Sequence, residues 1–254
     1  MKNSNLESLR DEIDRIDEQV VGLLNDRVQA AVKIGQIKDK LGVAPYDPAR
    51  EEQVFEKLLA ISEGPMQADS LRTIYREVIS ASIALEKELV IGYLGPEATY
   101  THQAAVKNFG TALTHRPLPD IPDVFQSVEQ GECDYGVVPI ENSSEGAVNR
   151  SLDLLVDSEL HIVSQVYLKV EHCLFSESAM EEIKEVRSKD QALAQCADWL
   201  RRNLPKASLT PVSSTAEAVR ECKSGQGTAA IAGKLAGGMH DVPLVEEGIQ
   251  DRKN

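Results

Sequence analysis

The sequence lacks several features that would assign it to particular classes of protein. Its four cysteines show no C-x-x-C spacing, which argues against a zinc site and favours reduced thiols. No apolar run is long enough to span a membrane, and the sequence shows no signal peptide. A net charge of −14 disfavours nucleic acid and anionic membranes as partners. We therefore expect a cytoplasmic protein that binds neither.

The first 88 residues are predicted to be entirely helical. Apolar residues recur at alternating spacings of three and four between positions 6 and 41, which is the pattern of a coiled-coil seam. A helix of about 36 residues would be about 54 Å long. Proline and glycine then separate it from two shorter helices near residues 49–61 and 68–88. These cannot cover the whole seam, so the length predicts a second copy of the chain as partner.

Cations interrupt this apolar seam. Arg27 replaces one apolar residue of the seam, and Lys38, about three turns further on, lies on the same face. Buried cations are costly unless they are paired, so we expect a bound anion there. Arg10 lies about 25 Å from Arg27 along the helix axis, so an antiparallel partner would be needed to bring it to that site. The alternative is that these cations are exposed on the surface.

The helical half contains further polar residues that periodicity does not explain. With the three cations above, they are Asp47, Arg50, Glu51, Ser82 and Glu86. Several cations from separate segments predict a ligand with more than one carboxylate, because the arginine fork binds carboxylates bidentately. No nucleophile with a neighbouring base accompanies them, which is typical of chemistry done by positioning and electrostatics. Asp47 also precedes Pro48 as a helix N-cap would.

On these residues the first half resembles the all-helical chorismate mutases. The resemblance rests on residues 9–14, 24–27, 34–38 and 47–51 and covers nearly all of residues 6–88. It implies a three-helix domain in an intertwined homodimer that rearranges chorismate, a dicarboxylate, to prephenate. It also implies that Arg10 comes from one chain, whereas Arg27, Lys38 and Arg50 come from the other.

The resemblance implies a role for each residue, with Lys38, Glu86 and Arg27 as the catalytic group. The arginines would hold the two carboxylates, and Lys38 would stabilise the charge on the breaking ether oxygen. Glu51 would hold a ring hydroxyl, while Asp47 and Ser82 would line the pocket. Glu86 departs from the family, in which many members have glutamine. It must be protonated to donate to the ether oxygen, so burial would have to raise its pKa.

From residue 89 onward, strands alternate with helices. Short apolar runs predict strands near residues 89–94, 135–140, 161–168, 171–175, 208–212 and 228–232, with helices that include 192–204 and 215–223. This alternation predicts an α/β domain that binds its ligand in the loops after the strands. Two such loops, 95–101 and 139–146, suit a small anion, although an ordinary capped turn is the alternative. Neither has the G-x-G-x-x-G pattern of dinucleotide sites, so we expect no cofactor and no metal.

This half resembles prephenate dehydratase from about residue 90 onward. Besides the two loops, the resemblance rests on residues 169–174, 191–196, 213–218 and 249–251. It implies a two-lobed α/β domain, like a periplasmic binding protein, that converts prephenate to phenylpyruvate with loss of carbon dioxide and hydroxide. The implied prephenate-binding residues are Thr101, Asn142, Ser143, Gln191, Ser214 and Thr215. His172 is expected to be structural, and residues 188–191 depart from the family's Ser-His-Pro-Gln.

We therefore predict a chorismate mutase domain at residues 1–88 and a prephenate dehydratase domain at residues 89–254, acting consecutively in phenylalanine biosynthesis. The chain stops before the family's Thr-Arg-Phe motif, its returning strand and its phenylalanine-sensing ACT domain. On that ground we expect weak or absent dehydratase activity and no inhibition by phenylalanine. The alternative is a chorismate mutase whose second half binds a ligand without turnover. A purely structural dimer would leave Arg27, Lys38 and Arg50 unexplained.

Overall fold

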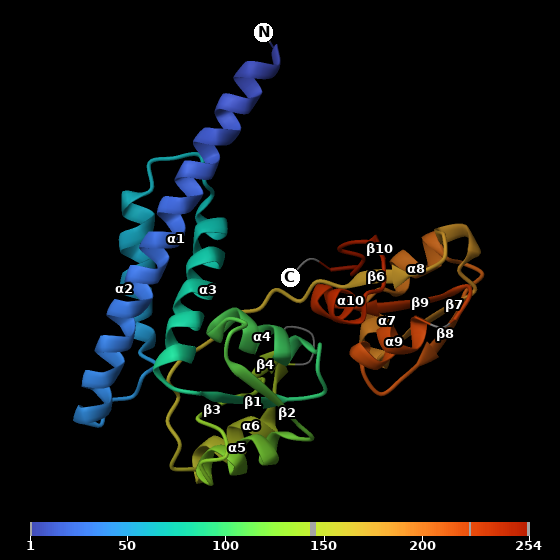
Figure 1. Cartoon of the computed structure of the whole chain (residues 1–254). Coiled ribbons are helices and arrows are strands. Elements are labelled where there is room, and N and C mark those ends of the chain that lie inside the picture. The colour runs from blue at the N-terminus through green and yellow to red at the C-terminus, as the bar shows by residue number, and fades with distance from the viewer. Residues whose placement is uncertain (1, 143–145, 224, 253–254) are drawn as a thin grey trace. The chain divides into compact units, whose positions relative to one another are not determined.

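The computed structural model describes residues 2–142, 146–223 and 225–252. It divides the chain into two compact units, a helical unit of residues 1–89 with 109–114 and an α/β unit of residues 90–108 with 115–254 (Figure 1). The chain therefore leaves the helical unit, returns to it for one short segment and leaves again. Among the described helices, none is long and apolar enough to cross a membrane.

The helical unit contains the three helices that the sequence predicts. They are α1 (Lys2–Leu41), α2 (Pro48–Ile61) and α3 (Ala68–Glu86). Helix α1 begins earlier than its apolar pattern indicates, and it packs against α3, which also packs against α2. The carboxylate of Asp47 accepts a hydrogen bond from the Arg50 backbone N–H over 3.0 Å and so caps α2, as its position before Pro48 predicts.

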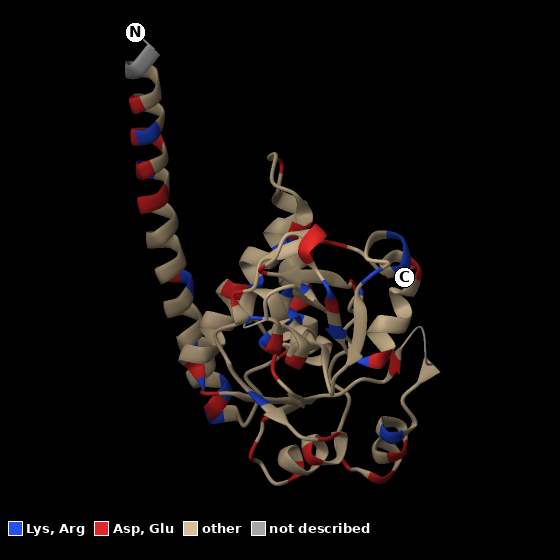
Figure 2. Cartoon of the chain, turned by 90° about the vertical axis from the view of Figure 1, so that its right-hand side faces the viewer, with Lys and Arg blue, Asp and Glu red and all other residues tan. Residues whose placement is uncertain are grey.

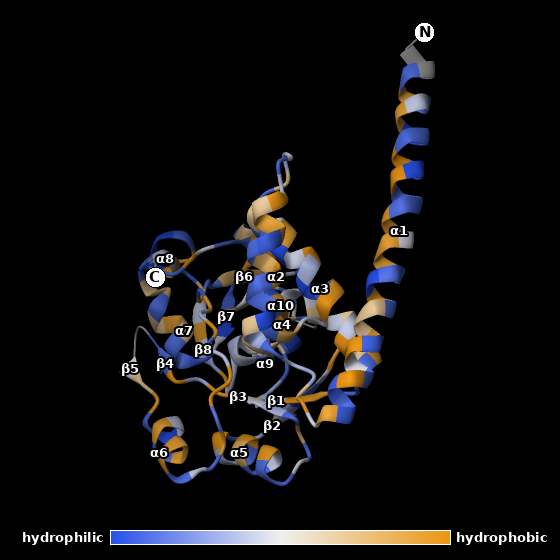
Figure 3. Cartoon of the chain, turned by 90° about the vertical axis from the view of Figure 1, so that its left-hand side faces the viewer, coloured by the Kyte–Doolittle hydropathy of each residue, from blue (hydrophilic) through white to orange (hydrophobic). Residues whose placement is uncertain are grey.

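The apolar seam of α1 is exposed along most of its length in the single chain. Leu23, Ile37 and Ile13 are 69%, 58% and 56% exposed, and Leu6, Leu9 and Leu41 are exposed as well. Figure 3 shows hydrophobic residues along the whole helix, and Figure 2 shows acidic and basic residues interspersed among its other positions. Neither α2 nor α3 covers this surface, which agrees with the expectation drawn from the helix length.

The segment of residues 109–114 completes the helical unit. The Phe109 ring is buried, with its centroid 4.8 Å from that of Tyr46, which lies in the turn between α1 and α2. Thr111 donates its backbone N–H and its hydroxyl to the Glu77 carboxylate on α3, over 3.0 and 2.5 Å. An aromatic contact at Phe109 and charged hydrogen bonds at Thr111 therefore fix the first half of this segment.

Gly110 is required in this segment for two reasons. Its φ of +76° lies in the left-handed region, and a Cβ there would overlap the Cβ of Ser80 on α3. The same Ser80 accepts a hydrogen bond from the Ala112 backbone N–H over 3.2 Å through its hydroxyl. The segment can therefore approach α3 this closely only with glycine at position 110.

The α/β unit contains a three-stranded sheet of order β2-β1-β3, in which β1 and β3 run parallel. Its strands are β1 (Val90–Leu94), β2 (Thr114–Leu118) and β3 (Tyr135–Val137). The helices along this part of the chain are α4 (Tyr100–Phe109), α5 (Ile121–Glu129) and α6 (Asn149–Asp157). A two-stranded antiparallel ribbon, β4 (Glu141–Asn142) with β5 (Gly146–Ala147), follows β3.

A five-stranded sheet of order β10-β6-β9-β7-β8 forms the rest of the unit. Strands β7, β8 and β9 run parallel, and β6 is antiparallel to β9 and β10. The strands are β6 (Cys173–Ser176), β7 (Glu185–Ser188), β8 (Ser208–Pro211), β9 (Thr228–Ala232) and β10 (Leu244–Glu246). The helices are α7 (Asp190–Gln195), α8 (Ala197–Asn203), α9 (Thr215–Cys222) and α10 (Lys234–His240), with a 3-10 turn at Met180–Glu182. Strand β9 is wholly buried and runs through the core.

Two predicted elements of this half are wrong. Residues 161–168 form no strand, although their apolar residues suggested one; none of the sheets of the described residues includes them, and Ile162 and Tyr167 are 73% and 78% exposed. The helix predicted over residues 192–204 is two helices, because the chain leaves helical geometry at Cys196 (φ −115°, ψ 11°). Periodicity alone does not reveal either interruption.

Replacing Gly110 with alanine tests the fit of the 109–114 segment. We expect the free energy of unfolding to fall by about 1–2 kcal/mol because alanine strains the left-handed backbone. Overpacking against Ser80 should lower it further, by about 1–3 kcal/mol. Gly131→Ala is the matched control, since Gly131 has a φ of +73° and no atom within 4 Å of an added Cβ. Urea denaturation would measure the free energy of unfolding of each variant. Equal losses in the two variants would show that the contact with Ser80 does not matter.

Candidate functional site

Arg27 joins α1 to α3 at the predicted anion site. Its Nη1 donates to the Ser82 hydroxyl over 3.0 Å, and Ser82 in turn donates to the Val78 carbonyl over 2.7 Å. The guanidinium carbon lies 6.0 Å from the ring centroid of Tyr75. Within the described residues, Arg27 has no carboxylate partner at ion-pair distance. Its positive charge is half-buried and is held by neutral groups only, which leaves it available to an anion.

Lys38 and Glu86 complete this part of the site. The Lys38 Nζ donates to the Pro45 carbonyl over 2.8 Å. Burial raises the pKa of the Glu86 carboxyl, and the positive charges of Lys38 and Arg27 partly offset that rise. Gly35 makes room for this carboxyl, because a Cβ at position 35 would lie 2.7 Å from Glu86 Cγ. The close approach of α3 to α1 therefore places an acid beside two cations.

Glu51 lies on α2 and is only 8% exposed. Its Oε2 accepts a hydrogen bond from Arg76 Nη1 over 2.8 Å, whereas its Oε1 is buried without a hydrogen-bond partner. Burial raises the pKa of Glu51, and Arg76 and, more weakly, Lys38 act against it. The local sequence gives no signal for Arg76, because its partner is on another helix. The signal that could have found it is the need of a buried carboxylate for a cation.

The other predicted residues of the helical half lie further out. Asp47 and Arg50 are exposed; Asp47 caps α2, and the Arg50 side chain reaches Gln53 Oε1 at 3.4 Å. Arg10 is exposed in the first part of α1. A single chain thus brings together Arg27, Lys38, Ser82 and Glu86, has Glu51 within the influence of Lys38, and leaves Arg10 apart.

In the α/β unit, the predicted prephenate-binding residues follow the carboxyl ends of parallel strands. Thr101 is in the first turn of α4 after β1, and Asn142 is in β4 after β3, so both lie at the same edge of the first sheet. Gln191 is the second residue of α7 after β7, and Ser214 caps α9 after β8, with Thr215 next to it. Ser143 lies outside the described residues.

The hydrogen bonds of these residues differ. The Ser214 hydroxyl accepts from the Glu217 backbone N–H over 3.1 Å, and Glu217 accepts in return from the Ser213 backbone N–H over 3.1 Å. Ser214 is therefore the N-cap of α9, and its side chain serves the helix, while the Glu217 carboxylate bonds back to the residue before the cap. In contrast, the side-chain amide Nε2 of Gln191 is buried without a hydrogen-bond partner. A buried donor of this kind is costly unless a ligand or water satisfies it.

His172 is held at both ring nitrogens. The Tyr100 hydroxyl lies 2.7 Å from its Nδ1, and Gln195 Oε1 lies 2.6 Å from its Nε2. Because Gln195 Oε1 can only accept, Nε2 carries the proton and Nδ1 accepts from Tyr100. Burial lowers the pKa of His172, which keeps the ring neutral. These contacts agree with the structural role expected for this residue.

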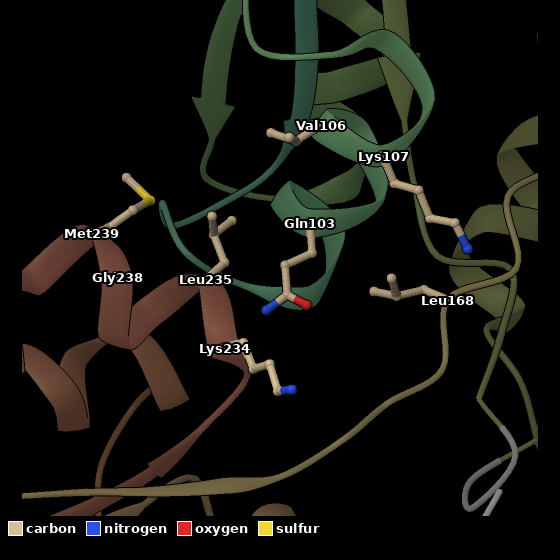
Figure 4. A pocket seen from close by; sticks show the side chains of 8 residues that line it. All are labelled: Gln103, Val106, Lys107, Leu168, Lys234, Leu235, Gly238 and Met239. Carbon is tan, nitrogen blue, oxygen red and sulfur yellow. The ribbon is translucent and has the colours of Figure 1, made fainter. Parts of the chain in front are cut away.

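A cavity of about 540 Å³ in the α/β unit is separate from the predicted prephenate-binding residues. Its lining residues are Gln103, Val106, Lys107, Leu168, Lys234, Leu235, Gly238 and Met239 (Figure 4). They come from α4, from α10 and from the extended chain ahead of β6, and most of the lining is apolar. Across the described ranges, no group of three or more His, Cys, Asp or Glu residues could hold a metal ion.

Comparison with known families gives two matches, one after the other along the chain. The model of chorismate mutase type II matches residues 9–87, and the model of prephenate dehydratase matches residues 91–254. Together these matches account for nearly the whole chain.

Individual proteins show the same pairing. A bifunctional chorismate mutase/prephenate dehydratase of Aquifex aeolicus (strain VF5) is 40% identical over 251 residues, which are 97% of this chain and 69% of that protein. The protein of the same name from Neisseria gonorrhoeae is 43% identical over 249 residues, 96% of this chain and 68% of its own. A solved structure is also similar, the crystal structure of prephenate dehydratase in complex with L-Phe from Arthrobacter aurescens. The match covers 65% of this chain and 57% of that chain, with 29% sequence identity and a TM-score of 0.60.

Proposed function

The chain belongs to the bifunctional chorismate mutase/prephenate dehydratase family, and from that premise we propose how its own residues serve the two reactions. It rearranges chorismate to prephenate and converts prephenate to phenylpyruvate by decarboxylating dehydration, in phenylalanine biosynthesis. The first reaction is assigned to residues 1–88 and the second to residues 89–254. The match to prephenate dehydratase over residues 91–254 favours turnover over the alternative of a second half that only binds a ligand.

The mutase site is built around the cations of α1. Arg27 and Arg50 bind the carboxylates of chorismate, and Lys38 stabilises the negative charge that develops on the ether oxygen in the transition state. Protonated Glu86 donates a hydrogen bond to the same oxygen from the opposite side, and Glu51 accepts one from the ring hydroxyl. Asp47 and Ser82 line the site. The observation that carries this assignment is the convergence of two half-buried, unneutralised cations of α1 with Glu86 of α3.

Two copies of the chain form each mutase site in this proposal. The exposed seam of α1 needs a cover, and an antiparallel α1 from a second copy supplies one of matching length and character. The same packing brings Arg10 of the partner subunit to the carboxylate-binding region. The four cysteines are free and buried, which supports the cytoplasm as the compartment.

The prephenate site comprises Thr101, Asn142, Gln191, Ser214 and Thr215, together with Ser143. The loops after β1, β3, β7 and β8 present backbone N–H groups and side-chain amides to the anionic substrate. Loss of carbon dioxide and hydroxide makes the ring aromatic, which drives the reaction. The unpartnered amide of Gln191 supports a polar ligand at this place.

Arg27→Ala tests the mutase assignment. Because a hydrogen bond to a charged group is lost, we expect kcat/KM for chorismate to fall by about 10- to 100-fold, with prephenate turnover and Tm unchanged. Arg15→Ala is the control, since Arg15 is exposed on the same helix and has no assigned role. Lower Tm with unchanged mutase activity in Arg27→Ala would identify Arg27 as structural instead.

Mixing two inactive variants tests the shared site. Arg10→Ala and Arg27→Ala are each expected to lose mutase activity as homodimers. In a mixed dimer, one site carries both changes and the other carries neither. Co-expression in equal amounts should therefore restore about a quarter of wild-type activity, since half of the dimers are mixed and each has one intact site. If mixed dimers form but activity does not recover, Arg10 and Arg27 of one chain contribute to the same site.

The pH dependence of the mutase tests Glu86. Only its protonated form donates to the ether oxygen, and burial raises its pKa, so that form persists to higher pH than for an ordinary glutamate. Activity should then fall as the pH rises through this raised pKa. Glu86→Gln should flatten that limb in a plot of kcat/KM against pH, because an amide donates at every pH. An equally steep alkaline loss in the variant would contradict the assignment.

A further inference from the structure

We propose that Arg76 is a positioning residue of the mutase site, which binds one oxygen of the Glu51 carboxylate and so leaves the other to accept a hydroxyl of the substrate. The proposal rests on the proposed function in one respect, the assignment of Glu51 to the ring hydroxyl of chorismate. It adds a residue that touches no substrate in this arrangement and acts through Glu51.

The two oxygens of Glu51 differ in their contacts. Oε2 lies 2.8 Å from Arg76 Nη1, and both side chains are largely buried, at 10% and 15% exposure. Oε1 is buried and has no hydrogen-bond partner among the described residues. A buried carboxylate normally has both oxygens satisfied, because each unsatisfied acceptor costs about 1–3 kcal/mol. In Glu51, Oε2 is bound by Arg76 and Oε1 remains able to accept a hydrogen bond. This arrangement suits a carboxylate that binds a hydroxyl group of the substrate.

Arg76 is itself held in place. Its guanidinium carbon lies 5.1 Å from the ring centroid of Phe55, which is buried on α2 one turn after Glu51. The guanidinium therefore contacts two neighbouring positions on one face of α2, an aromatic ring and a carboxylate. These contacts limit the rotation of the Glu51 side chain and fix the direction of Oε1.

Charges from all three helices act on Glu51. Burial is the largest influence and raises its pKa; Asp47 on α2 also raises it, while Arg76 on α3 and Lys38 on α1 lower it. Removing Arg76 would leave burial and Asp47 opposed by Lys38 alone, so the pKa would rise further. Glu51 would then take up its proton at a higher pH than in the wild type. Its buried carboxyl would also lose its fixed direction.

Arg72 offers a matched control one turn earlier on α3. It pairs with Glu52 of α2 at 2.5 Å, and its guanidinium carbon lies 4.9 Å from the same Phe55 ring. Its glutamate partner, however, is 53% exposed. Arg72→Met therefore removes the same kinds of contact as Arg76→Met, without affecting Glu51.

The experiment compares Arg76→Met, Arg76→Lys and Arg72→Met in the full chain, with the far-UV circular dichroism spectrum and Tm as the check on folding. Arg76→Met is expected to raise KM for chorismate about tenfold with little change in kcat, because an interaction made equally in the ground and transition states is weakened. The acidic limb of its kcat/KM profile should move to higher pH. Arg76→Lys should recover part of both effects, and Arg72→Met should show neither.

Two outcomes would separate the failure of this proposal from that of the underlying assignment. If Glu51→Ala raises KM but Arg76→Met matches Arg72→Met in KM and pH profile, Arg76 is a structural residue and the proposal is wrong. If Glu51→Ala keeps the wild-type KM, Glu51 does not bind the substrate, and the assignment fails together with the proposal. Should Arg76→Met fail to fold, Arg76→Lys decides: a wild-type KM and acidic limb would overturn the proposal, and a partial shift of both would support it.

Discussion

Positive charge that is half-buried without a carboxylate partner is the constraint on which the helical unit depends. Arg27 occupies a seam position of α1 that would otherwise be apolar, and Lys38 lies on the same face of the helix. Neutral oxygens of Ser82 and Pro45 accept hydrogen bonds from these two side chains. In the proposed mutase site, an anionic substrate offsets the cost of these charges. Gly35 has to be small, so that α3 can bring an acid close to both cations. Under that proposal, the incomplete pairing of these cations within the helical unit is what gives it affinity for the substrate.

The proposed prephenate site differs from the proposed mutase site, because no Lys or Arg among the described residues of the α/β unit is buried. Its candidate residues lie after the carboxyl ends of parallel strands, where backbone N–H groups at the starts of helices provide partial positive charge. Ser214 shows how closely such a site and an ordinary helix cap resemble each other, because its hydroxyl already serves α9. Gln191 is distinguished from it by a buried amide that the protein leaves without a partner.

Long-period patterns made the helical unit predictable, and short-range patterns predicted only part of the sheets. The seam of α1 continues over many turns, so its length and its interruption by Arg27 were evident from spacing alone. Strands β2 and β7 were missed because they are short and polar, with the sequences THRPL and EVRS. Residues 161–168 resemble a strand, but whether a strand forms depends on a neighbouring strand, which the local sequence does not specify.

The candidate site shows the same division between local and distant information. Asp47 was identifiable as a cap because the residues that determine it are adjacent in sequence. The pairing of Arg76 with Glu51 joins α3 to α2, and no periodicity in either helix singles out Arg76. Family resemblance supplied the roles of substrate-contacting residues, whereas residues that act only by holding another side chain required the three-dimensional structure.

The return of the chain to the helical unit at residues 109–114 bears on how such a two-activity chain can be rearranged by recombination. The chain crosses between the units at three points along its length, near residues 89, 108 and 114. A gene exchange at the first crossing would bring a foreign segment against Glu77 and Ser80 of α3, which hold Thr111 and Ala112. The two halves are therefore not interchangeable modules, and the residues of α3 that face this segment must be inherited together with it.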